Sequence, residues 1–575
     1  MPHLNTTLGL ISSRLVVKFL FSVLTLFFPI SLTAVVESPE LSRGSKSQLD
    51  ADSSIVSDLT LEEKVGQLLI VHFNGKKINY DARFLIEKVH VGGFVYFEWA
   101  NGLEDPIQVH RLSQSLQDFA ELYSLPLFIT IDQEGGSVVR LKKGFTIFPS
   151  NYALGRTKNP EFAMETAFAI GQELRAVGIN MNLAPVVDVN SNLKNPIIGI
   201  RSFSSIPTEV AKFGRMALEG YRKSKIIAVL KHFPGHGDTE ADSHVSLPIA
   251  RHDKKLFEEI ELYPFAQLSP NADAILTSHV LLPAWDPDNC VTFSPTIIQG
   301  LLREKLGFDG IVMSDSLVMQ GLLSICPSIE EAAIRCFEAG HDIILLGGKQ
   351  LAHKQTGFEL SVEDITRIHQ ALVNAVKQGR ISTERLDASV NRIVRLKRKY
   401  SLGQIENLRD NLHLLGTFEN KELAKDIAKQ AIQVMHTRVD LPYSKPLKKV
   451  LVVAPEAIKK EIENTNLSKI GEETKFFYYQ GFDPKISEKN QVNKLSLWAD
   501  TLIVCSYNAW KNEEQKEMIF NMQNSKKPLF IFVLNNPQDS TLFSRATVIL
   551  NTFSPDRNSI QAGINMMFEK SDIYE

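Results

Sequence analysis

Cysteine is scarce in this sequence of 575 residues: only Cys290, Cys326, Cys336 and Cys505 occur, with no CxxC pair. Four scattered cysteines make neither a disulfide scaffold nor a zinc ligand set. They do not indicate whether the protein works in an oxidising or a reducing compartment. A basic excess is also missing, since 63 Lys and Arg face 66 Asp and Glu. That balance argues against a nucleic-acid binder. With no low-complexity run or short repeat, the composition is that of a soluble globular protein.

The N-terminus has the order of a secretory signal. Arg14 and Lys18 precede an apolar run over residues 19–36, which is followed by polar residues. Pro29 and the length of the run fit a signal better than a stable membrane-spanning helix.

The cleavage site of this signal is imperfect, because Leu32 stands where a small residue is preferred. A retained membrane tether through residues 19–36 is therefore the alternative. We predict a signal peptide or N-terminal anchor over residues 1–36 and a polar linker over 37–55. We expect the rest of the chain to be exported, to the periplasm, to the cell envelope or as a secreted protein.

Residues 56–405 are predicted to form a (β/α)₈, TIM-like barrel. Thr60 and Glu63 have the spacing of a capping box at the start of a first helix. Apolar runs then alternate with helical segments, and several runs are apolar throughout, as strands buried on both faces should be. An open doubly wound sheet is the structural alternative. The eight runs are 68–73, 92–99, 126–132, 179–189, 226–233, 273–280, 310–316 and 342–348.

Polar residues at the ends of these runs favour the barrel. In barrels the carboxyl ends of the strands are where active sites are assembled. Packing in the core could explain one polar residue at a strand end, but not such residues at the ends of five successive strands. The residues are Asp132, Asp188, Lys231 with His232, His279 and Asp315.

The chain after the barrel is predicted to form a helical connector over 406–445 and a smaller α/β sandwich domain over 446–575. A charged helical stretch near 417–437 belongs to the connector. The second domain has no glycine-rich phosphate loop and no clustered catalytic side chains, so we expect a structural or docking role. Its predicted strands are 448–454, 500–507, 528–535 and 546–552.

The stretch KHFPGHGDTEADSH, residues 231–244, combines three histidines with three carboxylates. His232 and His236 have the spacing of a zinc-binding helix, but the proline and glycines around them disfavour a helix and therefore a metal site. A polar loop with hydrogen-bonded histidines is a second interpretation. The third is catalytic: Asp242, two residues before His244, can accept from one imidazole nitrogen, as an acid/base catalyst requires.

Three further stretches carry candidate site residues. Asp315 in GIVMSDSLVM ends a buried strand, and either an N-cap for the next helix or a catalytic role explains it. TIDQEGGSVVRL supplies Asp132 and Arg140, and NPIIGIRSFS supplies Arg201.

Together the four stretches resemble the family 3 glycoside hydrolases, in particular the β-N-acetylglucosaminidase branch that acts on bacterial cell-wall fragments. The shared pattern is DQEGG…R, an IGxRSF-like segment, KHFPGHG…DSH and SD(D/S)L, in this order, over roughly residues 55–400. The resemblance implies a retaining double displacement. Asp315 matches the nucleophile that forms a glycosyl-enzyme, His244 matches the acid/base on its loop, and Asp242 matches the residue that orients this histidine.

The resemblance also implies the sugar contacts, which are Asp132, Arg140, Arg201, Lys231 and His232. A carboxylate with cationic and imidazole donors suits ring hydroxyls, whose hydrogen bonds strengthen in the transition state of glycosidases. We expect no metal and no cofactor.

The expected function is removal of terminal non-reducing N-acetyl-β-D-glucosamine from peptidoglycan fragments. The expected partner is therefore a small carbohydrate, a GlcNAc-containing glycan or muropeptide. A phosphorylase or β-glucosidase on the same site is the enzymatic alternative, because a histidine acid/base would not repel phosphate. A non-catalytic glycan-binding envelope protein on the same fold is a third hypothesis, and a metallo-hydrolase that uses the histidine cluster is a fourth.

Overall fold

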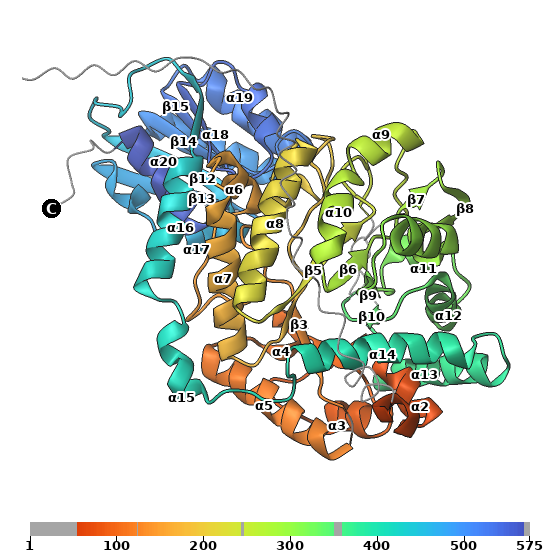
Figure 1. The fold of residues 1–575 in the computed structure, drawn as a ribbon. Helices are drawn as coiled ribbons and strands as arrows, with labels where there is room; N and C mark the ends of the chain where they lie inside the picture. Colours follow the sequence, from red (N-terminus) through yellow and green to blue (C-terminus); the bar gives the residue numbers. More distant parts are fainter. Residues whose placement is uncertain (1–53, 124, 243–245, 350–358, 569–575) are drawn as a thin grey trace, which may run out of the picture. The chain divides into compact units, whose positions relative to one another are not determined.

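Eight parallel strands form a nearly closed barrel in the computed structural model, which describes residues 54–123, 125–242, 246–349 and 359–568 (Figure 1). The predicted signal or anchor lies outside the described residues, as does nearly all of the predicted linker. The strands neighbour one another in the order β10-β1-β2-β3-β4-β5-β6-β9. They are β1 (Leu69–Val71), β2 (Gly93–Val95), β3 (Phe128–Ile131), β4 (Met181–Asn182), β5 (Ile227–Phe233), β6 (Ala274–Thr277), β9 (Ile311–Ser314) and β10 (Ile344–Leu346).

The barrel closes between the two end strands of this order. A parallel bridge joins Met313 of β9 to Ile343, next to β10, and the Leu317 amide donates to the Leu345 carbonyl at 3.0 Å. An open doubly wound sheet would leave these two strands unpaired. The predicted barrel is therefore confirmed, and each of the eight predicted runs contains one of its strands.

Helices surround the barrel because its strands are buried on both faces and need apolar cover. The predicted capping box is present, since the Glu63 amide donates to Thr60 Oγ1 and the Thr60 amide to Glu63 Oε2. The main helices are α2 (Leu61–Gln67), α3 (Tyr80–Glu87), α5 (Pro106–Tyr123), α7 (Glu161–Ala176), α8 (Pro207–Lys223), α10 (Tyr263–Leu268), η4 (Thr296–Lys305), α12 (Ile329–Ala339), α13 (Val362–Lys377) and α14 (Thr383–Lys399).

A second sheet of six strands follows in the order β11-β16-β15-β14-β12-β13. All of its pairs are parallel except β11 with β16, so the smaller α/β domain is confirmed as a mixed sheet. Its elements are β11 (Gln433–Thr437), β12 (Lys449–Pro455), β13 (Glu473–Tyr479), α18 (Ile486–Trp498), β14 (Thr501–Ser506), α19 (Glu513–Asn524), β15 (Leu529–Val533), β16 (Val548–Asn551) and α20 (Arg557–Phe568).

The connector differs in part from the helical prediction. Helix α16 (Phe418–Ala431) ends before residue 433, and residues 433–437 form β11 at the edge of the second sheet. Pairing with β16 determines the conformation of these residues, although their local sequence is typical of a helix.

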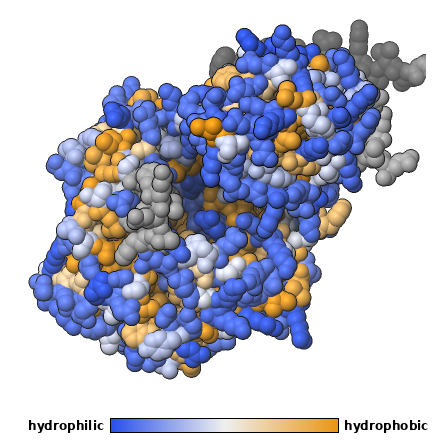
Figure 2. Space-filling view, turned by 180° about the vertical axis from the view of Figure 1, so that it is seen from behind, coloured by the Kyte–Doolittle hydropathy of each residue, from blue (hydrophilic) through white to orange (hydrophobic). Residues whose placement is uncertain are grey.

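The surface seen in Figure 2 is mainly hydrophilic, with scattered apolar residues and a hollow near the centre of this face. Among the described residues, no helix combines the length and the apolar character needed to cross a membrane.

Candidate active site

Oppositely charged side chains gather at the carboxyl ends of β3 and β5. Lys231 Nζ lies 2.8 Å from Asp132 Oδ1 and 2.6 Å from Glu134 Oε1. Arg201 donates from Nε and Nη2 to the two oxygens of Glu134, each at 2.9 Å. Arg140 Nη2 is 3.8 Å from Asp132 Oδ2. The structure therefore brings together four of the five predicted sugar contacts, from three separate segments of the chain.

Glu134 organises this cluster although it is almost fully shielded from solvent. Its side chain is 2% exposed. Burial alone would raise the pKa of Glu134, but the attraction of Arg201 and Lys231 outweighs it and holds this pKa far below its usual range. Burial would likewise lower the pKa of Lys231, yet the carboxylates of Asp132 and Glu134 raise it above its ordinary value. Glu134 and Lys231 are therefore fixed charges at neutral pH.

His232, the fifth predicted contact, is held by a buried carboxylate. Its Nδ1 lies 2.6 Å from Asp188 Oδ2, and its Nε2 lies 3.3 Å from Arg201 Nη2. Burial would raise the pKa of Asp188, but His232 lowers it below its ordinary value. With the Nδ1 proton assigned to the Asp188 bond, Nε2 is the acceptor facing Arg201.

An irregularity in β5 lets consecutive residues share the site. Along a regular strand, neighbouring side chains point to opposite faces. The pairing of β5 with β6 shifts between Lys231 and Phe233, leaving His232 as an extra residue. Such bulges re-aim side chains and are common beside active sites. The bulge explains how Lys231 reaches Glu134 while His232 reaches Arg201.

The loop after β5 is anchored at its root. The His236 amide donates to Asp188 Oδ1 at 2.8 Å, and the Asn195 amide group donates to the His236 carbonyl at 2.7 Å. Gly237 approaches the chain so closely that a Cβ there would stand 1.6 Å from the Val189 carbonyl oxygen. Only glycine fits this position.

His236 itself is a buried, neutral histidine. Burial lowers its pKa to about 4, and its Nδ1 lies 2.7 Å from Thr239 Oγ1. The described residues contain no group of three His, Cys, Asp or Glu side chains placed to hold a metal ion.

The predicted acid/base pair is described only in part, because His244 lies outside the described residues. Asp242 is described, and its carbonyl accepts from the Ser246 amide at 3.0 Å. Partial burial lowers the pKa of Lys511, and the attraction of Asp242 opposes that shift. Lys511 belongs to the second domain, so a cation of that domain faces the loop that carries Asp242.

Asp315 follows β9 at the carboxyl end of the barrel. Its amide donates to the Thr277 carbonyl of β6 at 3.1 Å, and its Oδ1 accepts from the Ser316 amide at 2.7 Å. The next helix, α11 (Gln320–Leu323), has Met319 as its N-cap residue and no side-chain cap. The N-cap interpretation of Asp315 is therefore wrong, and the position at the barrel mouth stands.

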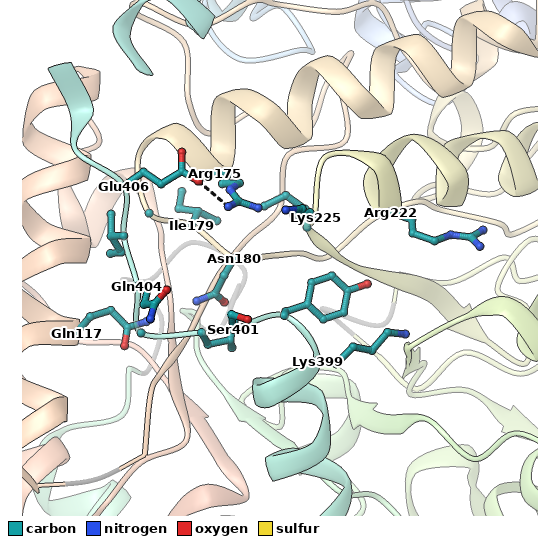
Figure 3. A pocket seen from close by; sticks show the side chains of 16 residues that line it. Gln117, Arg175, Ile179, Asn180, Arg222, Lys225, Lys399, Ser401, Gln404 and Glu406 are labelled. Carbon is teal, nitrogen blue, oxygen red and sulfur yellow. Dashed lines mark hydrogen bonds and ion pairs between the residues drawn. The ribbon is translucent and has the colours of Figure 1, made fainter. Parts of the chain in front are cut away.

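A separate cavity of about 390 Å³ lies at the opposite end of the barrel, where α7, α8 and α14 end (Figure 3). Arg175, Arg222, Lys225 and Lys399 line it, and Arg175 pairs with Glu406 at 2.5 Å. Cations are favoured at helix carboxyl ends by the helix dipole, so these residues need no ligand to explain them. None of the predicted site residues that the structure describes lines this cavity.

The chain is similar to known proteins in both sequence and fold. A β-hexosaminidase A from Pseudoalteromonas piscicida is 34% identical over 437 residues, which are 69% of this chain and 71% of that protein. The solved structure of a glycoside hydrolase family 3 β-N-acetylglucosaminidase from Paenibacillus sp. FPU-7 is 34% identical. It superposes with a TM-score of 0.80 over 89% of this chain and 98% of that chain.

A β-glucoside phosphorylase BglX shares the fold, with a TM-score of 0.74 at 20% identity, over 92% of this chain and 95% of that one. The family model for the glycosyl hydrolase family 3 N-terminal domain matches residues 60–396, which is more than half of the sequence. This match covers the whole barrel with its site cluster, and the chain therefore belongs to glycosyl hydrolase family 3.

Proposed function

We propose that this enzyme is a retaining β-hexosaminidase that removes terminal non-reducing N-acetyl-β-D-glucosamine, with peptidoglycan fragments as its substrates. The observation that carries the proposal is the cluster of Asp132, Lys231 and Arg201 at the carboxyl ends of the strands of a family 3 barrel. Relatives and solved structures at about a third identity are named for hexosaminidase or N-acetylglucosaminidase activity, which supports the sugar.

The sugar ring binds through hydroxyl groups to the charged cluster. Asp132 accepts from ring hydroxyls, while Arg140, Lys231 and His232 fill out the pocket around them. Arg140 has a buried Nε with no hydrogen-bond partner among the described residues, and a substrate oxygen satisfies it. The rigid ion pairs keep these donors oriented before substrate arrives, which lowers the cost of ordering them in the transition state.

Two displacements then exchange the groups on the anomeric carbon. In the first, an Asp315 carboxylate oxygen bonds to this carbon as its bond to the leaving oxygen breaks, and His244 gives its proton to that oxygen. In the second, His244 takes a proton from water, the water oxygen bonds to the carbon, and the bond to Asp315 breaks. Asp242 orients His244 and favours its protonated ring.

The test is hydrolysis of para-nitrophenyl N-acetyl-β-glucosaminide by wild type, Asp315→Ala and His244→Ala. We expect Asp315→Ala to be inactive. The loss in His244→Ala should shrink with a better phenol leaving group, and added azide should restore turnover by replacing water in the second step. A wild type that cleaves only glucosides would refute the hexosaminidase assignment.

Phosphate distinguishes hydrolysis from phosphorolysis. We expect free N-acetylglucosamine as the product with or without phosphate, whereas a glycosyl phosphate would identify a phosphorylase. We further propose that the enzyme works outside the cytoplasm, supported by the signal-like order of residues 1–36. Fractionation of cells that express the full chain tests this location.

A further inference from the structure

A second cluster of side chains lies at the carboxyl ends of β1, β2 and β10. The rings of Phe97 and Trp99 are stacked, with centroids 5.3 Å apart and planes 20° apart. His72 meets Trp99 edge-on at 5.3 Å. Lys349 Nζ lies 4.1 Å from the centroid of the Trp99 ring and 3.2 Å from Glu359 Oε2. We call these five residues the Trp99 platform.

The Trp99 platform borders the position of the nucleophile. Ser316, next to Asp315, donates from Oγ to the Gly347 carbonyl of the segment that follows β10. A Cβ on Gly348 would lie 3.8 Å from Ser316 Oγ and 3.9 Å from the Phe97 ring. Ser316 and Phe97 therefore both lie next to Gly348.

Trp99 remains partly exposed to solvent among these contacts. The residue is 42% exposed although a phenylalanine stacks on it and a histidine packs against its edge. Large aromatic side chains supply much of the binding energy at recognition sites, because they offer a rigid apolar face at low entropic cost. A pyranose ring has an apolar face of C–H groups that matches such a surface.

The charges of the platform can rearrange without leaving a carboxylate unpaired. Glu359 accepts from Asn74 Nδ2 and lies 3.3 Å from His72 Nε2, in addition to its pair with Lys349. Lys349 is therefore able to exchange Glu359 for a ligand carboxylate while Glu359 keeps two partners. The ammonium group is a point charge on a flexible stem, which suits this exchange.

We propose that the Trp99 platform is the subsite for the aglycone sugar, whose ring replaces the Lys349 ammonium on the face of Trp99 while Lys349 moves aside to bind a carboxylate that this sugar carries. The inference rests on the proposed function: an enzyme that removes a terminal sugar holds that sugar in its pocket, so only the leaving-group side of the substrate extends beyond it. The ligand class is a β-linked disaccharide whose second sugar is an acidic amino sugar.

The experiment compares three substrates that differ only on the leaving-group side. N-acetyl-β-glucosaminyl fluoride has no aglycone ring, diacetylchitobiose has a neutral aglycone sugar, and β-1,4-linked N-acetylglucosaminyl-N-acetylmuramic acid has an acidic one. We expect Trp99→Ala to lower kcat/KM by about tenfold for both disaccharides while the fluoride stays within about twofold of wild type. Trp99→Phe should recover part of the loss.

Lys349→Met tests the charge. We expect it to lower kcat/KM for the acidic disaccharide by about tenfold, and for diacetylchitobiose by no more than about twofold. The matched control is Lys475→Met, because Lys475 Nζ lies 3.9 Å from the centroid of Trp498 in the second domain. This control should leave all three rates at the wild-type value.

The outcomes separate the subsite from the proposed function. If wild type cleaves none of the three substrates, the proposed function is refuted. If wild type cleaves the fluoride but Trp99→Ala changes no disaccharide rate, or lowers all three rates equally, the subsite is refuted and the function stands. Equal losses on both disaccharides in Lys349→Met would refute the carboxylate contact.

Discussion

Replacing Glu134 by glutamine tests whether a residue shielded from solvent controls the proposed sugar site. The change keeps the shape of the side chain but removes its charge. Arg201 then loses one of the two oxygens of residue 134 as an acceptor, and Lys231 is left with Asp132 as its carboxylate partner. We expect both stability and activity to fall, for separable reasons.

The expected loss of stability follows from burial. Removing one partner of a buried ion pair costs about 3–5 kcal/mol, because the remaining charge is left uncompensated. The pH dependence has a definite sign. Since the pKa of Glu134 is held far below its unfolded value, its contribution is present above pH of about 4.3 and is lost as the pH falls below that. The variant should lack this part of the acid-side slope.

The expected loss of activity follows from orientation. One charge-assisted hydrogen bond to a substrate hydroxyl contributes about 2–3 kcal/mol, so a misdirected Arg201 or Lys231 should lower kcat/KM by about 30- to 160-fold. The assay is the initial rate on the para-nitrophenyl glycoside, with urea unfolding followed by intrinsic fluorescence on the same samples.

Glu173→Gln is the matched control for this prediction. Glu173 is also buried, but its partners Thr146, Gly416 and Asn420 are neutral donors away from the site. Its variant should keep kcat/KM near the wild-type value. If Glu134→Gln shows wild-type kcat/KM and an unchanged urea midpoint, Glu134 does not organise the site and the reasoning is refuted.

Three further predictions concern positions elsewhere in the barrel domain. Burial raises the pKa of Glu261 to about 8, whereas a glutamate in the unfolded chain has a pKa of about 4.3. The free energy of unfolding should therefore fall as the pH rises between these values, and Glu261→Gln should flatten that slope in urea titrations at about pH 5 and about pH 9. Asp342→Ala should lower the free energy of unfolding by about 3–5 kcal/mol, because fully buried Asp342 pairs with Arg303 and Arg392; a loss below about 1 kcal/mol would contradict this. Gly136→Ala should lower soluble yield and activity together, since its Cβ would stand 2.5 Å from Ser150 Cβ at a φ of +58°.

The barrel could be predicted from the sequence because its strands are apolar throughout and end in polar residues. Asp132 and Asp315 each follow such a run, and each lies at a strand's carboxyl end in the structure. Strand β13 is not among the predicted strands, because Glu473–Tyr479 begins with polar residues and lies at the edge of the second sheet. The strand at residues 433–437 is not predicted either. Its partner, β16, is more than a hundred residues away, and the local sequence does not indicate that pairing.

The organisation of the site was less accessible to sequence reasoning. Glu134 lies inside the DQEGG stretch, yet nothing in its spacing shows that it turns inward to Arg201, 67 residues later. Asp188 could be identified from the sequence as a carboxylate at a strand end. Its pairing with His232 depends on a bulge in β5 that the local sequence does not reveal. Pairings of this kind depend on tertiary contacts between strands, which no single stretch encodes.

The contacts around Ser150 bear on what the second domain does. Ser150 donates from Oγ to the Phe553 carbonyl at 2.5 Å, and its amide donates to Ser554 Oγ at 3.1 Å. Ser150 also packs against Gly136, two residues from Glu134. The second domain is therefore joined through Ser150 to the segment that carries Glu134.

A second contact reaches the other edge of the site, where Asn536 donates to the Leu193 carbonyl at 2.7 Å, two residues before the Asn195 that anchors the loop after β5. The second domain thus supports both the segment that carries Glu134 and the root of the loop that we propose to carry the acid/base. Because rigid support of such groups determines how well they are oriented for the transition state, we predict that this domain is also needed for full activity. A barrel separated from the second domain should therefore lose kcat/KM even where it keeps its fold, and full activity of the isolated barrel would contradict this role.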